Sequence, residues 1–273
     1  MSSLVVNFNA EAANAVLNLD TTNYQLSQAI QQLSSGLAVQ YSYQGPAAWS
    51  ISQYLQYQNA GDTQGVANAT QGVSVLNIAS GAINQIAGIL DQMEQLATSS
   101  ANAGAMNSVA QQQNEVQFTA LYLEINNIVA NTTYGNQPLL NGSYNNETFQ
   151  IGFQSSNTIN VSIPSLTFGG LGLTGLKVYN ASLATVAITG IQNALQILSN
   201  ASATVGASQD QLQAFVQDLQ TMSTNVESAN SSVVDVNMAQ GMTQFTTDQI
   251  LLQSGLSMLG QAQANPTLVL KLL

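Results

Sequence analysis

The sequence predicts a mainly α fold, with long antiparallel coiled-coil-like helices from both termini and a small β-hairpin subdomain. Three observations lead to this fold class. Apolar residues recur at alternating steps of four and three over residues 5–37, 191–233 and 238–259, which is the spacing of helices that pack along their lengths. Two adjacent stripes of this kind cover residues 69–96, which predicts a broad buried side. Residues 131–176 are instead rich in Asn, Gly, Ser and Thr and contain short alternating runs typical of strands.

The first predicted helix carries one stripe over residues 5–37. Its positions are Val5, Asn9, Ala12, Val16, Leu19, Asn23, Leu26, Ile30, Leu33 and Leu37. Eight of these ten are apolar, which indicates a coiled-coil seam that ends near Gly36. The stripe is equally compatible with packing inside one subunit and with packing between subunits.

The middle of the chain predicts a bundle with a hairpin attached. Residues 41–59 read as an irregular connector because Gly45-Pro46 interrupts the pattern, and they include the single tryptophan, Trp49. Helices are expected over 61–101 and 106–130, separated by a break at Asn102-Ala103-Gly104. A β-hairpin is expected at about 147–163, where two alternating runs flank Ser155-Ser156-Asn157. The glycine-rich run 169–172 is interpreted as a connector.

A long helix is then expected over residues 183–233. Nine of the thirteen positions in its stripe are apolar. The remaining four are polar and are predicted to fix the register of the helix against its partner: Ser202, Gln209, Ser223 and Asn230.

The last predicted helix is apolar on one side and needs a partner. Its stripe comprises Met238, Met242, Phe245, Leu252, Leu256 and Leu259, with polar Gln249 in the same series. Ile250, Leu251 and Met258 widen this side. We expect the chain to turn at Asn265-Pro266 and to end on an apolar tail. No obvious partner for the stripe exists within one subunit, although docking on the chain's own core is the simpler alternative.

Several motifs resemble those of bacterial flagellins. Residues 33–37 read LSSGL, residues 132–142 read TTYGNQPLLNG, and residues 245–255 read FTTDQILLQSG, before a QA pair, a proline and a final VLKLL. The resemblance implies an inner domain of residues 1–42 plus 236–273 and an outer core domain of residues 43–235. It also implies that the variable outer domain of the family is essentially absent.

This resemblance implies a structural subunit that polymerises into the bacterial flagellar filament for motility. The alternative is a flagellar hook–filament junction protein, which shares the same kind of ends. The implied partners are copies of itself, the flagellar type III export apparatus, an export chaperone and the filament cap, with the protein located outside the cell. The residues expected at the polymerisation interface are Val16, Leu19, Leu26, Ile30, Leu33, Met242, Phe245, Leu252, Leu256, Leu259, Leu270 and Leu273.

Composition argues against most other classes of function. The chain has two lysines, no arginine, no histidine, no cysteine and a net charge of −11, so we expect no nucleic-acid binding. Without histidine or cysteine, a catalytic triad, a zinc site and thiolate chemistry are not expected, and no cofactor or metal is predicted. No uninterrupted apolar run long enough for a membrane span occurs, and the N-terminus lacks the features of a Sec-type signal. We therefore expect a protein that is not an enzyme and does not bind a membrane.

The scarcity of basic residues suggests an adaptation to acidic surroundings. Carboxylates become neutral near about pH 4, whereas lysine and arginine remain charged, so this chain would hold only about +3 at pH 2. Asn, Gln, Ser and Thr would provide hydration that does not titrate. Adaptation to high salt is a competing explanation, although thirteen acidic residues are few for it. A glycan-covered surface is a second alternative.

Overall fold

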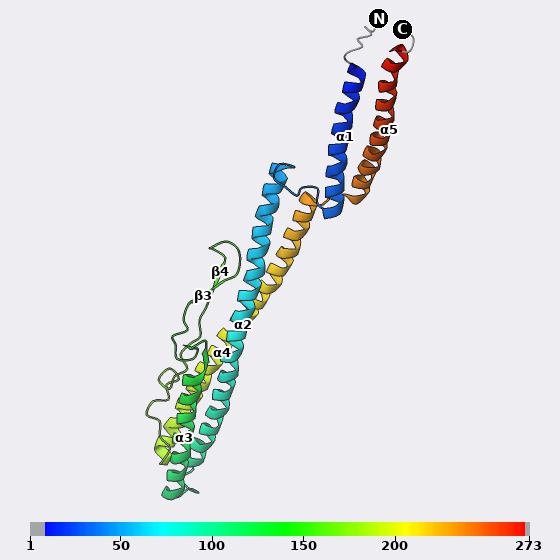
Figure 1. The fold of residues 1–273 in the computed structure, drawn as a ribbon. Coiled ribbons are helices and arrows are strands. Elements are labelled where there is room, and N and C mark those ends of the chain that lie inside the picture. Colours follow the sequence, from blue (N-terminus) through cyan, green and yellow to red (C-terminus); the bar gives the residue numbers. More distant parts are fainter. Residues whose placement is uncertain (1–8, 271–273) are drawn as a thin grey trace. The chain divides into compact units, whose positions relative to one another are not determined.

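The computed structural model describes residues 9–270, with side chains from Asn9 to Ala264. Within that range the protein is mainly α, as predicted (Figure 1). The chain forms two compact units: unit 1 combines Met1–Gln56 with Val226–Leu273, and unit 2 is Tyr57–Asn225. The helices are α1 (Ala10–Ser35), α2 (Pro46–Ala101), α3 (Ser108–Asn131), α4 (Ala181–Val234) and α5 (Met238–Leu270).

Helix α1 begins and ends where its capping residues dictate. The Asn9 side chain accepts a hydrogen bond from the Ala12 amide, which satisfies one of the unpaired donors of the first turn. Gly36 follows the helix with a φ of 76°, a left-handed conformation that glycine adopts at little cost. The predicted end near Gly36 is thus confirmed, whereas Val5 and the other positions before Asn9 lie outside the described residues.

Helix α2 begins earlier than the sequence analysis expected. Residues 46–60 are helical, so the prediction of an irregular connector through residue 59 is wrong. Pro46 occupies the first helical position, where its missing N–H would have no partner in any case and its fixed φ suits the helix. The Trp49 amide then donates to the Gly45 carbonyl at 2.8 Å. Gly45-Pro46 therefore starts the helix instead of interrupting it.

Polar pairs link α2 to α4 along unit 2. Gln209 donates to Asn77 at 2.9 Å, and Ser223 donates to Asn59 at 2.5 Å. These are two of the four polar positions expected to fix the register. Of the other two, Ser202 is exposed, and the side-chain oxygen of Asn230, in unit 1, is buried without a hydrogen-bond partner among the described residues.

The core of unit 2 lies where the helices meet the segment that follows the hairpin. Residues 164–180 have no regular secondary structure, yet Leu171 and Leu173 are completely buried. The run 169–172 thus connects the hairpin to α4 and also fills part of the core. The large side chains that are fully buried in this unit include Leu76, Ile83, Ile86, Leu90, Met93, Ile125, Leu139, Leu140, Ile163, Leu166, Leu171, Leu173, Ile191 and Leu212.

The predicted β-hairpin is present and lies against α2. It consists of β3 (Glu147–Gln150) and β4 (Thr158–Val161), paired antiparallel with Phe149 opposite Ile159. Two glycines of α2 let the hairpin approach closely. A Cβ on Gly61 would lie 2.2 Å from the Phe153 Cβ, and a Cβ on Gly65 would lie 2.7 Å from the Ile151 backbone. The Asn68 side chain also donates to the Gln150 carbonyl at 2.8 Å.

A carboxylate is buried beside this contact. Asp62 is 1% exposed, and neither of its oxygens has a hydrogen bond of normal geometry among the described residues. Burial raises the pKa of Asp62 above its ordinary value of 3.8, while interactions with the Gln58 side chain and the Phe153 backbone lower it by less. The charged form of Asp62 is therefore less favourable in the folded protein than in the unfolded chain.

A second, smaller hairpin was not predicted from the sequence. Strands β1 (Thr133–Tyr134) and β2 (Gln137–Pro138) pair antiparallel through a two-residue turn. Gly135 and Asn136 both have positive φ, 54° and 67°, as the type I′ turn of short hairpins requires. The Gly-Asn pair was a usable signal, but strands of two residues are too short to show alternation.

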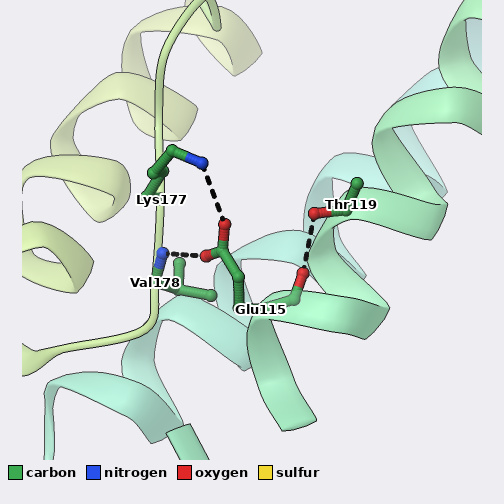
Figure 2. Close-up of polar contacts among 4 residues, drawn as sticks. All are labelled: Glu115, Thr119, Lys177 and Val178. Carbon is green, nitrogen blue, oxygen red and sulfur yellow. Dashed lines mark hydrogen bonds and ion pairs between the residues drawn. The ribbon is translucent and has the colours of Figure 1, made fainter. Parts of the chain in front are cut away.

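An ion pair attaches the segment before α4 to α3. Figure 2 shows Glu115 of α3 accepting a hydrogen bond from the Val178 amide at 2.5 Å, with the Lys177 ammonium 3.6 Å from its other carboxylate oxygen. Asn180 then caps α4 by accepting from the Leu183 amide. The predicted helix 183–233 corresponds to α4, and the predicted 106–130 corresponds to α3.

Two helices are apolar enough to span a membrane by length and composition. The windows lie in α2, with a mean hydropathy of 1.5, and in α4, with a mean of 1.3. Burial inside the protein accounts for 44% of the window in α2 and 28% of the window in α4. The core helices of soluble proteins commonly have this composition, so two such helices are weak evidence for a membrane span.

Candidate assembly surface

Unit 1 is organised by a backbone junction between the end of α1 and the start of α5. Leu37 and Asp235 form an antiparallel β-bridge, and the Val236 amide donates to the Gly36 carbonyl at 2.9 Å. Asn237 caps α5 by accepting from the Ala239 and Gln240 amides. From this junction α5 packs along α1, as Figure 1 shows.

Two glycines of α5 set the close approach of this helix pair. A Cβ on Gly241 would lie 2.9 Å from the Leu33 Cδ2, and a Cβ on Gly255 would lie 2.8 Å from the Leu19 Cδ2. The two contacts show that the helices are antiparallel, because the later residue of α5, Gly255, lies against the earlier residue of α1, Leu19. At the far end, the Asn9 side chain donates to the Ala262 carbonyl at 2.8 Å.

The inner side of the pair buries little. Leu19 and Ala29 are buried on α1, and the buried residue on α5 is Asp248, which is 1% exposed. One oxygen of Asp248 accepts from the Gln244 side chain at 2.8 Å, while the other has no partner among the described residues. A buried carboxylate oxygen without a hydrogen bond costs stability, so this seam is weaker than its length suggests.

The residues expected at the polymerisation interface are divided between two sides of the pair. Leu19 is buried, and Leu26, Leu33, Phe245, Leu252 and Leu259 are half-buried. Val16, Ile30, Met242 and Leu256 are exposed, from 42% for Val16 to 56% for Leu256. Leu270 belongs to α5, but its side chain lies outside the described residues, as does all of Leu273.

Two expectations about the C-terminal helix are wrong. Its stripe does have a partner within the subunit, because α1 covers the side that contains Phe245 and Leu252. The chain also does not turn at Asn265-Pro266, since α5 continues to Leu270. Proline removes one hydrogen bond from a helix and favours a kink, but its φ is helical, so it does not always end one.

Other apolar side chains of α1 and α5 remain exposed. They were only partly predicted, because Leu17 and Tyr24 of α1 lie outside the four–three stripe, although Ile250, Leu251 and Met258 were expected to widen it. A groove of about 860 Å³ runs between the helices and is lined by Leu251, Gly255 and Met258 among others. The exposed apolar residues are Val16, Leu17, Tyr24, Ile30, Met238, Met242, Ile250, Leu251, Leu256 and Met258.

We call these ten side chains the outer face of the helix pair. Large exposed apolar surfaces of this kind mark contacts with other molecules. Two helices can bury only the stripe that each turns toward the other, so the outer face requires further layers. Among the described residues, no three His, Cys, Asp or Glu side chains gather as metal ligands would.

Comparison with known proteins identifies close similarity over the whole chain. The family model for the bacterial flagellin N-terminal helical region matches residues 6–145, and the model for the bacterial flagellin C-terminal helical region matches residues 188–273. The chain is 30% identical to a flagellin of Halalkalibacterium halodurans, over 99% of this chain and 100% of that protein. It is 27% identical to a flagellin of Bacillus subtilis, over 98% and 99%.

Solved structures share the fold. The chain resembles the crystal structure of Bacillus cereus flagellin, with a TM-score of 0.52 and 22% identity over 60% of this chain and 94% of that one. It also resembles a Vibrio parahaemolyticus protein described as a flagellar hook-associated protein, with a TM-score of 0.59 and 11% identity, over 70% of this chain and 100% of that one.

Proposed function

This chain belongs to the bacterial flagellin family, and from that membership we propose how it works as a structural subunit of the flagellar filament. Flagellins polymerise, so the open question is which surfaces of this chain meet. The outer face of α1 and α5 is the proposed contact. It includes Val16, Ile30, Met242 and Leu256 of the expected interface, while the other described members of that set hold the two helices together.

Energetics supports this assignment. Burying an exposed leucine or methionine side chain yields about 1.5–3 kcal/mol, so ten exposed apolar residues represent a large driving force. An assembly in which each subunit uses different patches for its neighbours grows as a helical polymer when the rotation between subunits does not close a ring. The observation that carries the proposal is that α1 and α5 pack on each other and still leave ten large apolar side chains exposed.

The alternative of a hook–filament junction protein receives less support. The likeness to the hook-associated protein comes with 11% identity and shows a shared fold. The flagellins of Halalkalibacterium halodurans and Bacillus subtilis align over 100% and 99% of their lengths, at 30% and 27% identity, and this favours the filament subunit.

The remaining parts of the proposal concern export and domain roles. We propose that the subunit leaves the cell through the flagellar type III apparatus, with an export chaperone and the filament cap as transient partners, and functions outside the cell. We also propose that residues 1–42 with 236–273 form the inner domain of the filament and residues 43–235 the outer core. These assignments rest on family membership.

Adaptation to acid is a further part of the proposal. Among the described residues the fold contains one ion pair, Lys177 with Glu115, so protonating the carboxylates would remove few favourable contacts. Packing acidic subunits together should raise the pKa of their carboxyl groups relative to the free subunit. The polymer then binds more protons, so assembly is strongest below the free-subunit pKa values and weakens as pH rises through the raised ones.

Sedimentation of the purified protein tests both levels of the proposal. Filaments that pellet and appear as tubes by electron microscopy would support the structural role, and a protein that stays monomeric under every condition would contradict it. Repeating the measurement from about pH 2 to 8 at low salt, where screening is weakest, tests the adaptation. Filaments that persist at neutral pH but dissociate at about pH 2–3 would show that the acid proposal is wrong.

A further inference from the structure

The loop before α2 and the first turns of α2 expose four aromatic rings. Tyr41 and Tyr43 stack on each other, with ring centroids 5.5 Å apart and planes 7° apart, and are 48% and 66% exposed. Trp49 and Tyr54 follow on α2, 37% and 55% exposed. We call Tyr41–Tyr54 the aromatic segment. It belongs to unit 1 and was not part of the interface that the sequence analysis predicted.

The exposed area is large for a surface that faces only water. An aromatic side chain offers about 150–250 Å² for burial, so these partly exposed rings leave on the order of 400 Å² in solvent. A stable interface covers about 800 Å² on each partner. The aromatic segment is therefore too small to hold two molecules together alone, but it suffices as one part of a larger contact.

The rings point in more than one direction. Trp49 and Tyr54 lie about 140° apart around the axis of α2, because each residue turns a helix by about 100°. Ser52, between them in sequence, is 3% exposed and marks the buried side. A two-fold dimer would cover a single patch, whereas the subunits of a non-closing polymer have neighbours on several sides.

Charge indicates which molecule covers the segment. The sequence has no charged residue between Asp20 and Asp62, although the chain carries a net charge of −11. Two copies of so acidic a chain repel each other, and the repulsion is smallest where the surfaces that meet lack carboxylates. A basic partner would instead be attracted by acidic side chains, which this segment does not have. The uncharged aromatic surface thus fits a second copy of the same chain.

We propose that the aromatic segment is a contact between neighbouring subunits of the filament, made by ring packing instead of charge pairs. This inference rests on the proposed function and adds a contact outside the outer face of α1 and α5. Because ring packing is screened little by salt, the contact persists at high ionic strength. It also implies that the contact does not depend on pH.

The single tryptophan allows a direct test on the unmodified protein. Trp49 is the only tryptophan of the chain, so its fluorescence reports this position alone. Acrylamide quenching is compared for the monomer and for pelleted filaments, at low and high salt. We expect quenching of Trp49 to fall by about threefold in filaments, with a blue-shifted emission, because a covered ring loses most of its contact with solvent.

The outcomes separate this inference from the proposed function. Filaments that form normally while Trp49 stays as accessible as in the monomer would overturn the inference and leave the filament role intact. The absence of any filament would overturn both.

A pair of variants tests the other side of the segment. Tyr54→Gln should raise the lowest concentration at which filaments form by about tenfold, as for a residue central to an interface. Tyr179→Gln, at a 41% exposed tyrosine of unit 2, is the matched control and should change it little. Circular dichroism should show equal helix content in all three monomers. Equal effects of the two substitutions, or no effect of Tyr54→Gln, would contradict the inference.

Discussion

The two units use the same helical spacing but bury very different amounts of it. The large apolar side chains that are fully buried among the described residues all lie in unit 2, where α2, α3, α4, the β3–β4 hairpin and residues 164–180 surround one core. In unit 1 the buried apolar residues are Leu19, Ala29, Val226 and Val234. Periodicity tells which residues form a stripe, whereas the number of layers decides whether that stripe is covered.

This contrast predicts that unit 2 folds by itself and that unit 1 depends on its neighbours. The largest effect is expected from removing residues 249–273. The shortened chain should remain a monomer and form no filaments, because most of α5 and its part of the outer face are gone. Its unit 2 should still unfold cooperatively on heating. Sedimentation and circular dichroism measure the two properties, and normal filaments from the shortened chain would show that the comparison is wrong.

Matched leucine substitutions sharpen the contrast. Leu171→Ala, at a fully buried position of unit 2, should lower the free energy of unfolding of the monomer by about 2–5 kcal/mol. Leu256→Ala, at a 56% exposed position of α5, should change it by no more than about 0.5 kcal/mol, yet should weaken filament formation. Urea denaturation of both monomers provides the measurement. A large loss of monomer stability in Leu256→Ala would mean that the outer face is already covered within the subunit.

Glycines within α2 offer a test with opposite signs. Gly65→Ala would place a Cβ 2.7 Å from the Ile151 backbone and should destabilise unit 2 by about 1–3 kcal/mol, by forcing the hairpin away from the helix. Gly88→Ala meets nothing within 4 Å and should stabilise the helix by up to about 1 kcal/mol. Thermal unfolding of the two variants should therefore shift in opposite directions. Two stabilising substitutions would show that the hairpin does not rest on α2.

The smallest expected effect concerns Asp62 and depends on pH. Because burial raises the pKa of this carboxyl, the contribution of Asp62 to the stability of unit 2 is fully present below pH 3.8 and is lost as pH rises through the raised native value. Asp62→Asn removes the charge and should be more stable than the wild type at pH 7, by on the order of 1 kcal/mol. That advantage should disappear below pH 3.8, which urea denaturation at both pH values would reveal. An advantage independent of pH would exclude the charge as its cause.

The sequence predicted the helices and the larger hairpin well because their signals are local and repeated. Features that depend on contacts between two segments, or on which end of a helix a proline occupies, were not predicted. Gly45-Pro46 was interpreted as a break because proline ends many helices, yet here it begins one. The contacts of Gly241 with Leu33 and of Gly255 with Leu19 need both helices in place, and no pattern in either helix alone indicates them.

For the candidate site, the stripe combined residues that the structure separates by exposure. Phe245 and Leu252 are half-buried, whereas Met242 and Leu256 are exposed, although all four belong to one apolar series. A stripe broad enough for two partners cannot reveal which part each partner takes. Buried Asp248 was not expected for a similar reason: hydrophobic patterning assigns charged residues to the surface.

The ion pair between Lys177 and Glu115 has a consequence for how long the protein survives among digestive enzymes. Proteases of the trypsin type cut after lysine or arginine, and this chain offers them two lysines and no arginine. One of the two, Lys177, pairs with the carboxylate of Glu115, and that carboxylate also accepts a hydrogen bond from the amide of the next residue, Val178. A cut there requires the segment around Lys177 to leave α3 first. A chain with so few basic residues thus offers such enzymes very few peptide bonds to cut.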